Sequence, residues 1–323
     1  MTVGFNGAIS VEVQKHDFPG CVHSASDGRL VAAQCGVRGK GGAPDAHLCP
    51  LLLLVLVLVP SPPPPPPPPP DLLAFLSPGD DFWSEVDQQV YQPNTFRVIE
   101  HILSRTPRGV YADLGSYVGP TVLFGGHLAA SVLAVESDPQ SFSTLNANLR
   151  LNPRVETRTR LVFGCAGDGG TAEFAGSGLP DSRRKGGLLL DGLREDRVWG
   201  LKTGSKWTHE CLPLAALLEG AGLDARALAL VNVDVVGSEL WALPGLRTAL
   251  TARGPTKKPA VLLHVYAPLW DATASVKQKA WDVVASFAFV YDGNFQLLPR
   301  SSSPAFCEEL GCTMLLSDVE ISL

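Results

Sequence analysis

From about residue 80 onward, short apolar runs alternate with segments of helical periodicity. The apolar runs predict strands over 109–114, 131–136, 158–165, 227–235 and 259–266. The intervening segments predict helices that open at Pro120 and at Pro139, behind Asp138 as a cap, and helices over 213–219, 238–251 and 274–286. Two last apolar runs, 288–292 and 313–317, predict an antiparallel pair at one side of the sheet. This alternation is typical of an α/β domain with a doubly wound, mostly parallel sheet.

The first quarter of the chain follows a different pattern. Residues 1–47 are rich in Gly, Ala and Ser without a sustained apolar period, which indicates a low-complexity leader. Residues 48–59 form a short apolar segment, shorter than the ~20 residues of a spanning helix but as long as a signal-peptide core. Residues 60–77 form a proline-rich spacer of polyproline II character. We therefore expect the folded domain over 78–323.

Composition narrows the class of protein and its compartment only in part. The 323 residues are 45% hydrophobic and 18% charged, which suits one large α/β domain and excludes a wholly disordered chain. A net charge of −6 gives no reason to expect nucleic acid as a partner. The chain is expected in the cytoplasm, or on a secretory-pathway membrane if 48–59 acts as a signal anchor.

Cysteine and histidine positions bear on metals and disulfides. The seven cysteines are scattered and never form C-x-x-C, so we expect neither a zinc knuckle nor a disulfide framework. The histidines show no metal-ligand spacing, so we expect no metal site.

The most informative stretch is Val110–Pro120, a strand that ends in Asp113 and turns through two glycines into a helix. Gly115 and Gly119 suit either a tight turn or close approach of a ligand, and the helix N-terminus favours an anionic group. Glu136 ends the next strand, 21 residues after Gly115, where an acid in a doubly wound fold reaches a ribose diol. The pattern predicts a nucleoside-cofactor site.

Two details favour S-adenosylmethionine over a nicotinamide dinucleotide. Tyr117 stands where the dinucleotide turn needs its second glycine. Asp113 precedes the glycines, where its carboxylate can hold a cationic amine. A nicotinamide dehydrogenase is therefore disfavoured.

Several ordered motifs resemble the FkbM-type class I methyltransferases. They are Asp113-Leu-Gly-Ser-Tyr-Val-Gly119, Val132-Leu-Ala-Val-Glu-Ser-Asp-Pro139, Leu145-Asn-Ala-Asn-Leu-Arg-Leu-Asn152 and Leu230-Val-Asn-Val-Asp-Val-Val-Gly-Ser-Glu239. The resemblance spans 97–266. It implies a seven-stranded Rossmann-like sheet, S-adenosylmethionine as cofactor, and O-methylation of a hydroxyl on a sugar or other small molecule.

The resemblance also implies roles for individual residues. The implied cofactor-binding residues are Asp113, Gly115, Ser116, Tyr117, Gly119, Glu136, Ser137 and Asp168. Of these, Glu136 is expected on the ribose and Asp168 near the adenine, although Asp168 suits a turn equally well. The candidate catalytic residues are Asp234, His264 and Glu239. Asp234 would face the transferred methyl group, whereas a histidine on an apolar strand is more often a core residue than a base.

Three positions depart from the family pattern. Asn232 stands where the family has Lys, Val236 where it has Glu, and His264-Val-Tyr266 where it has Glu-Ile-His. An alternative is therefore a non-catalytic cofactor-binding or protein-interaction module with a degenerate active site. The loop 177–210, with a basic triplet and two tryptophans, suits either a lid over an acceptor or a solvated loop.

Overall fold

The chain divides into two units, Met1–Pro63 and Pro64–Leu323. In the computed structural model, the described residues are 2–5, 9–12, 21–26, 29–35, 82–175, 187–189, 206–254, 257–270, 272–299, 307 and 311–322. The first unit contains two antiparallel hairpins, β1 (Thr2–Phe5) with β2 (Ile9–Glu12) and β3 (Cys21–Ser26) with β4 (Arg29–Cys35). The sequence pattern did not predict these strands. The predicted apolar segment 48–59 and proline-rich spacer 60–77 lie outside the described residues.

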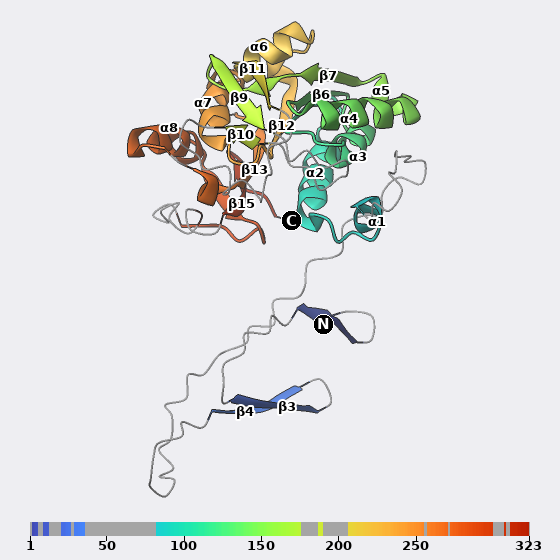
Figure 1. The fold of residues 1–323 in the computed structure, drawn as a ribbon, viewed down its shortest axis with the longest axis vertical. Helices are drawn as coiled ribbons and strands as arrows, with labels where there is room; N and C mark the ends of the chain where they lie inside the picture. The colour runs from blue at the N-terminus through green and yellow to red at the C-terminus, as the bar shows by residue number, and fades with distance from the viewer. Residues whose placement is uncertain are drawn as a thin grey trace, which may run out of the picture. The chain divides into compact units, whose positions relative to one another are not determined.

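A seven-stranded sheet organises the second unit (Figure 1). Its strands are β5 (Val110–Leu114), β6 (Ser131–Glu136), β7 (Thr159–Phe163), β12 (Leu228–Val233), β13 (Ala260–Val265), β14 (Phe289–Asp292) and β15 (Cys312–Ser317). Their order is β14-β15-β13-β12-β5-β6-β7, and β15 alone runs in the opposite direction to the other six strands. The expected Rossmann-like sheet with an antiparallel edge pair is confirmed. It is the class I methyltransferase fold.

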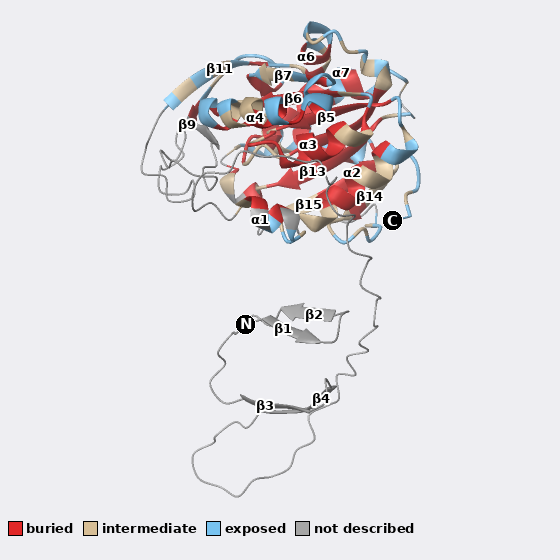
Figure 2. Cartoon of the chain, turned by 90° about the vertical axis from the view of Figure 1, so that its right-hand side faces the viewer, coloured by how far each residue is buried: buried red, intermediate tan, exposed pale blue. Residues whose placement is uncertain are grey.

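Helices cover both faces of this sheet because its strands are apolar on both sides. They are α1 (Phe82–Asp87), α2 (Pro93–Arg105), α3 (Pro120–Leu128), α4 (Pro139–Leu151), α5 (Pro153–Glu156), α6 (Leu214–Gly220), α7 (Glu239–Leu250) and α8 (Ala274–Ala285). One core joins alternate strand residues to α6, α7 and α8, and the other joins the remaining strand residues to α1 through α5. Figure 2 shows the strands buried between these layers. No helix in the described part of the chain is both long enough and apolar enough to cross a membrane.

Two helices begin where the sequence predicted. Pro120 and Pro139 both occupy the first turn, where a proline loses no helical hydrogen bond. The Asp138 carboxylate caps α4 by accepting hydrogen bonds from the N–H groups of Gln140 and Ser141, at 2.8 and 3.0 Å. Both helices therefore start at the carboxyl edge of the sheet, beside the candidate site.

A second, smaller sheet is formed by strands that follow β7 in the chain, and it was not predicted. Its order is β10 (Gly187–Leu189), β9 (Thr171–Ala175), β11 (Lys206–Leu212) and β8 (Cys165–Ala166). The sequence suggested residues 177–210 as a lid, and β11 begins within the last residues of this segment. Most of the segment lies outside the described residues.

Two disulfides correct the expectation drawn from the cysteines. Cys165 and Cys211 are joined across β8 and β11, with Cα atoms 4.6 Å apart, and Cys307 is joined to Cys312 with Cα atoms 5.0 Å apart. Cysteine spacing gave no sign of the first pair because its members are 46 residues apart in the chain. The prediction that no disulfide framework is present was wrong.

Candidate functional site

The carboxyl ends of β5, β6 and β12 meet at one edge of the sheet. The turn after β5 is fixed to β6 because the N–H groups of Gly115 and Ser116 both donate to the carbonyl of Val135. It is fixed to β12 because the Asp234 N–H donates to the carbonyl of Leu114 at 2.9 Å. These three strand ends therefore form one rigid platform, the place where doubly wound sheets bind ligands.

The two glycines of the turn have packing reasons of their own. Gly115 and Gly119 have φ angles of +82° and +99°, in the region that favours glycine. A Cβ at Gly115 would collide with the Asp234 carbonyl, and one at Gly119 would collide with the side chain of Leu145. The glycines are thus required by the protein's own packing, whether or not a ligand also approaches them.

Asp113 is fully buried at the end of β5. Its carboxylate accepts hydrogen bonds from the Tyr111 hydroxyl, the Thr121 hydroxyl and the Asn232 amide, at 3.0, 2.5 and 3.1 Å. Burial raises the pKa of Asp113 to about 6, although these three bonds lower it. Since Asp113 has no exposed surface, it ties β5 to α3 and β12, and no face is open for the predicted contact with a cofactor amine.

Asn232 now has a structural explanation. It lies opposite Asp113 in the parallel register of β12 and β5, and its amide donates to that carboxylate. The amide thus serves as a donor to the buried acid at the position where the FkbM motif has a lysine.

Glu136 ends β6 with its carboxylate held by two backbone groups. The Tyr117 N–H donates to Oε2 and the Asp138 N–H donates to Oε1, both at 2.7 Å. Burial raises the pKa of Glu136 to about 7, against these hydrogen bonds. Glu136 keeps 7% of its surface exposed and each carboxylate oxygen keeps a second lone pair, so the orientation is fixed while acceptor capacity remains for a diol.

Asp234 follows β12 and is half-buried. The Gln92 side-chain amide donates to its Oδ2 at 3.0 Å, from a position 142 residues earlier in the chain. Its Oδ1 is buried and has no hydrogen-bond partner in the described part of the protein. Such an orphaned acceptor is costly in a folded protein, which makes it a candidate ligand contact.

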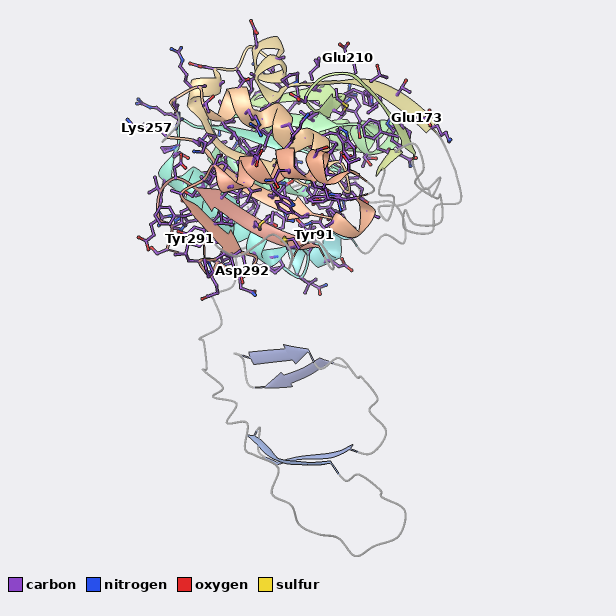
Figure 3. All side chains as sticks on the ribbon, turned by 90° about the vertical axis from the view of Figure 1, so that its left-hand side faces the viewer. Tyr91, Glu173, Glu210, Lys257, Tyr291 and Asp292 are labelled. Atoms are coloured by element: carbon purple, nitrogen blue, oxygen red, sulfur yellow. A yellow bond between two sulfur atoms is a disulfide. The ribbon has the colours of Figure 1, made fainter. Side chains whose placement is uncertain are left out.

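Two tyrosines, Tyr91 and Tyr266, lie near Asp234. Tyr91 is labelled in Figure 3; the Phe82 ring contacts it at 4.8 Å between centroids and contacts Tyr117 at 5.6 Å. Burial raises the pKa of both Tyr91 and Tyr266, and the Asp234 charge raises each further. Tyr266 is also hydrogen-bonded to the Asp234 side chain, which raises its pKa again. These phenols are therefore neutral near pH 7 and present uncharged groups beside the carboxylate.

The surroundings of Glu239 indicate a structural role rather than a catalytic one. It is fully buried in the first turn of α7, where its Oε1 accepts from the Gly237 N–H and its Oε2 from the Trp270 indole N–H, at 2.8 and 2.7 Å. Burial raises its pKa to about 7. Both oxygens are engaged inside the protein, so Glu239 braces the loop after β12, and no face is open for a catalytic contact.

His264 also lies in the interior. Its Nε2 is 3.5 Å from the Thr95 hydroxyl of α2 and its Nδ1 is 3.3 Å from the Thr313 hydroxyl of β15. With 6% of its surface exposed, it matches the core histidine that the sequence left open as the alternative to a base.

Asp168 and Ser137 lie on the β7 side of the platform. Asp168 is exposed in the bend after β8, and the His209 ring nitrogen Nε2 lies 2.9 Å from the Ser137 carbonyl. The exposed ring of Phe163 packs between Phe142 and His209, with centroid distances of 4.9 and 4.6 Å. This aromatic group lies beside Glu136, as a base-binding surface would.

The sequence missed the contribution of the segment before β5. Tyr91 and Gln92 precede the first strand of the sheet, and only the packing of α2 brings them to β12. Pro93 was the one local signal that could have pointed to these residues. A proline at this position marks the start of a helix, and the start of a helix that packs on the sheet lies near one of its edges. No cluster of potential metal ligands occurs among the residues that the structure describes.

No protein-family model matches the sequence, and no curated protein matches it. Solved methyltransferase structures are similar at low identity. FkbM from Methylobacillus flagellatus KT is 16% identical over 65% of this chain and 44% of that chain, with a TM-score of 0.39. WbdD is 12% identical over 79% and 46%, with a TM-score of 0.40, and the METTL16 methyltransferase domain is 11% identical over 73% and 69%, with a TM-score of 0.37.

This chain thus spans less than half the length of the FkbM and WbdD structures. With TM-scores below 0.5, these likenesses carry no argument about the site. The resemblance to the FkbM family stays a prediction, and the function rests on the strand order and the geometry of the platform.

Proposed function

We propose that the protein is an S-adenosylmethionine-dependent methyltransferase that methylates a hydroxyl on a sugar or other small molecule. The observation that carries the proposal is Asp234 on the platform of a class I methyltransferase fold, with one buried carboxylate oxygen that meets no hydrogen-bond partner in the described part of the chain.

The residues at the platform fit this cofactor. Glu136 offers two oriented carboxylate oxygens for the ribose hydroxyls. Asp234 lies at the end of β12, which is separated from β6 by β5, and its Oδ1 has no hydrogen-bond partner in the described part of the chain. The exposed face of Phe163 provides an apolar surface for the adenine. When bound, S-adenosylmethionine would supply an activated methyl group on a sulfonium.

The chain's own contribution is orientation and proton transfer. Holding acceptor and methyl group in line contributes ~7 to 11 kcal/mol to such reactions. A hydroxyl acceptor must also lose its proton, and Asp234 Oδ1 is the group placed to receive it. Gln92 and the backbone of the β12 loop keep this carboxylate in place.

The disulfides bear on where the reaction takes place. Disulfides persist in oxidising compartments, so the two pairs favour the secretory alternative over the cytoplasm. A glycan hydroxyl is then the favoured acceptor. Peptide mapping of the full chain without reductant, which should recover both linked peptide pairs, tests this part of the proposal.

Turnover separates the enzyme from a cofactor-binding module. The full-length chain with S-adenosylmethionine and a panel of methyl glycosides and phenols is expected to form S-adenosylhomocysteine in an acceptor-dependent way. Asp234→Asn should lower this rate about 100-fold or more, because the proton acceptor is lost. Glu219→Gln, which changes an exposed acid of α6, is the matched control and should leave the rate unchanged.

Two results would contradict the proposal. An unchanged rate in Asp234→Asn would remove the role given to that carboxylate. Tight cofactor binding without S-adenosylhomocysteine formation from any acceptor of the panel would favour the non-catalytic module, for which Val236 in place of the family's glutamate is the sequence evidence.

A further inference from the structure

Gln92 is the N-cap residue of α2, but its side chain does not cap that helix. Residues at this position commonly cap their own helix with a side-chain oxygen. Gln92 makes no such bond, and its amide instead donates to Asp234 Oδ2. Its backbone has φ 42° and ψ 51°, a left-handed conformation that is unfavourable for a residue with a Cβ. The hydrogen bond from Gln92 to Asp234 therefore occurs together with backbone strain at Gln92 and with an α2 N-terminus that has no side-chain cap.

Strain of the same kind gathers around Asp234. Tyr117 and Val236, which lie in the two neighbouring loops, have φ angles of 51° and 39°. Together with Gln92, they make up three of the five non-glycine residues with positive φ in the described part of the chain. Such residues cluster where a ligand site requires a fixed geometry.

The result is a carboxylate with one free direction. Gln92 occupies Oδ2, the Tyr266 hydroxyl is hydrogen-bonded to the same carboxyl group, and Oδ1 is buried without a hydrogen-bond partner among the described residues. No lysine or arginine in that part of the chain forms an ion pair with Asp234. The negative charge is therefore not neutralised by a basic side chain of the described protein.

Several groups near Asp234 favour a cation. The Asp234 charge raises the pKa of the Asp113 and Glu239 carboxyl groups and of the Tyr91, Tyr111 and Tyr266 phenols. None of them carries a positive charge. Acidic oxygens and aromatic rings both attract cations, and most strongly where water is excluded.

We propose that Gln92 is a positioning residue that aims Asp234 at the positive sulfonium of the cofactor, so that the site distinguishes S-adenosylmethionine from the neutral thioether S-adenosylhomocysteine. This inference rests on the proposed function. It adds a consequence for the reaction cycle: methyl transfer removes the positive charge from sulfur, the attraction to Asp234 ends, and the product is released more readily than the substrate.

Calorimetric titration of the full-length chain with each of the two ligands tests the inference without an acceptor. The wild type should bind S-adenosylmethionine roughly tenfold more tightly than S-adenosylhomocysteine, as expected for one charge-assisted contact. Asp234→Asn should bring the ratio of the two dissociation constants to about one. Gln92→Ala should reduce the ratio about threefold or more, through weaker binding of S-adenosylmethionine alone.

Two glycine variants separate the side chain from the backbone. Gln92→Gly tolerates the left-handed conformation and keeps the fold, yet it should lose the preference as Gln92→Ala does. Gln89→Gly changes a residue of the same segment that also has a positive φ, 59°, and it should keep the wild-type ratio. A merely structural role for Gln92 predicts that Gln92→Gly keeps the ratio as well.

The outcomes are distinct. Equal affinities in the wild type, or an unchanged ratio in both Gln92 variants, would overturn the inference while leaving the cofactor assignment intact. A folded wild-type chain that binds neither ligand would overturn the proposed function together with the inference.

Discussion

Two acids five residues apart, Asp234 and Glu239, have opposite relations to the rest of the molecule. Asp234 is half-buried, and one of its oxygens meets no hydrogen-bond partner in the described structure. Glu239 is fully buried, and each of its oxygens accepts a hydrogen bond from a group that has no other role at the site. The sequence offered both as catalytic residues. The contrast teaches that an acid with no exposed surface and with both oxygens engaged supports the fold, whereas an acid with an oxygen left without a partner is available to a ligand.

The loop between the two acids explains the difference. After β12 the backbone passes through Val236 and Gly237, both with positive φ, and this reversal turns Glu239 inward beneath Trp270. Asp234 stays at the strand end, where Gln92 reaches it.

Removing Glu239 should have the largest effect on stability. Glu239→Ala leaves two buried donors, the Gly237 N–H and the Trp270 indole N–H, without partners, and we expect a loss of about 4 kcal/mol in the free energy of unfolding. Asp234→Ala should cost only about 1 kcal/mol, because the hydrogen bonds from Gln92 and Tyr266 that it removes belong to a half-buried group. Urea unfolding followed by tryptophan fluorescence measures both. Equal losses would remove the distinction between the two acids.

The pH dependence of stability should carry the signature of Glu239. Its pKa is about 7 in the folded state against 4.5 for an unperturbed glutamate. The folded state therefore keeps a proton that the unfolded state releases, so stability is highest below pH 4.5 and falls as the pH rises through 7. For this residue the loss amounts to about 3 kcal/mol at pH 8.

Glu239→Gln isolates that contribution. Since Glu136 and Asp113 have raised pKa values in both proteins, the difference between wild type and variant belongs to Glu239. Unfolding free energies from pH 4.5 to 8 should decline less in Glu239→Gln than in the wild type. Parallel curves would show that the buried carboxyl does not retain its proton.

Relieving the backbone strain at Val236 should have the smallest effect on stability. Val236→Gly removes a β-branched side chain from a backbone with φ 39°, and we expect a gain of about 1 kcal/mol in the free energy of unfolding. Val236→Ala keeps a Cβ in the same conformation and should give no gain. A glycine variant that is less stable than the alanine variant would mean that Val236 packing outweighs the strain.

Sequence patterns predicted the large sheet well because its strands are buried on both faces and read as continuous apolar runs. The helix starts at Pro120 and Pro139 were equally clear, since proline and the Asp138 cap are local signals. Glu136 could be located at a strand end from its spacing to Gly115.

Other features depend on contacts that no local pattern encodes. Strand β11, Lys-Trp-Thr-His-Glu-Cys-Leu, is mostly polar and follows a glycine-rich stretch, so it did not read as a strand. The Cys165–Cys211 pair joins positions 46 residues apart. Gln92 reaches Asp234 across 142 residues, and the full burial of Asp113 and Glu239 became visible only with the packed structure.

The central claim is that the platform binds S-adenosylmethionine through Glu136. The direct measurement is calorimetric titration of the full-length chain and of Glu136→Ala with S-adenosylmethionine, with NAD as the competing ligand. We predict micromolar binding of S-adenosylmethionine, affinity lower by roughly 10- to 100-fold in Glu136→Ala, and no binding of NAD. A folded chain that binds NAD instead, or that binds S-adenosylmethionine equally well without Glu136, would contradict the account.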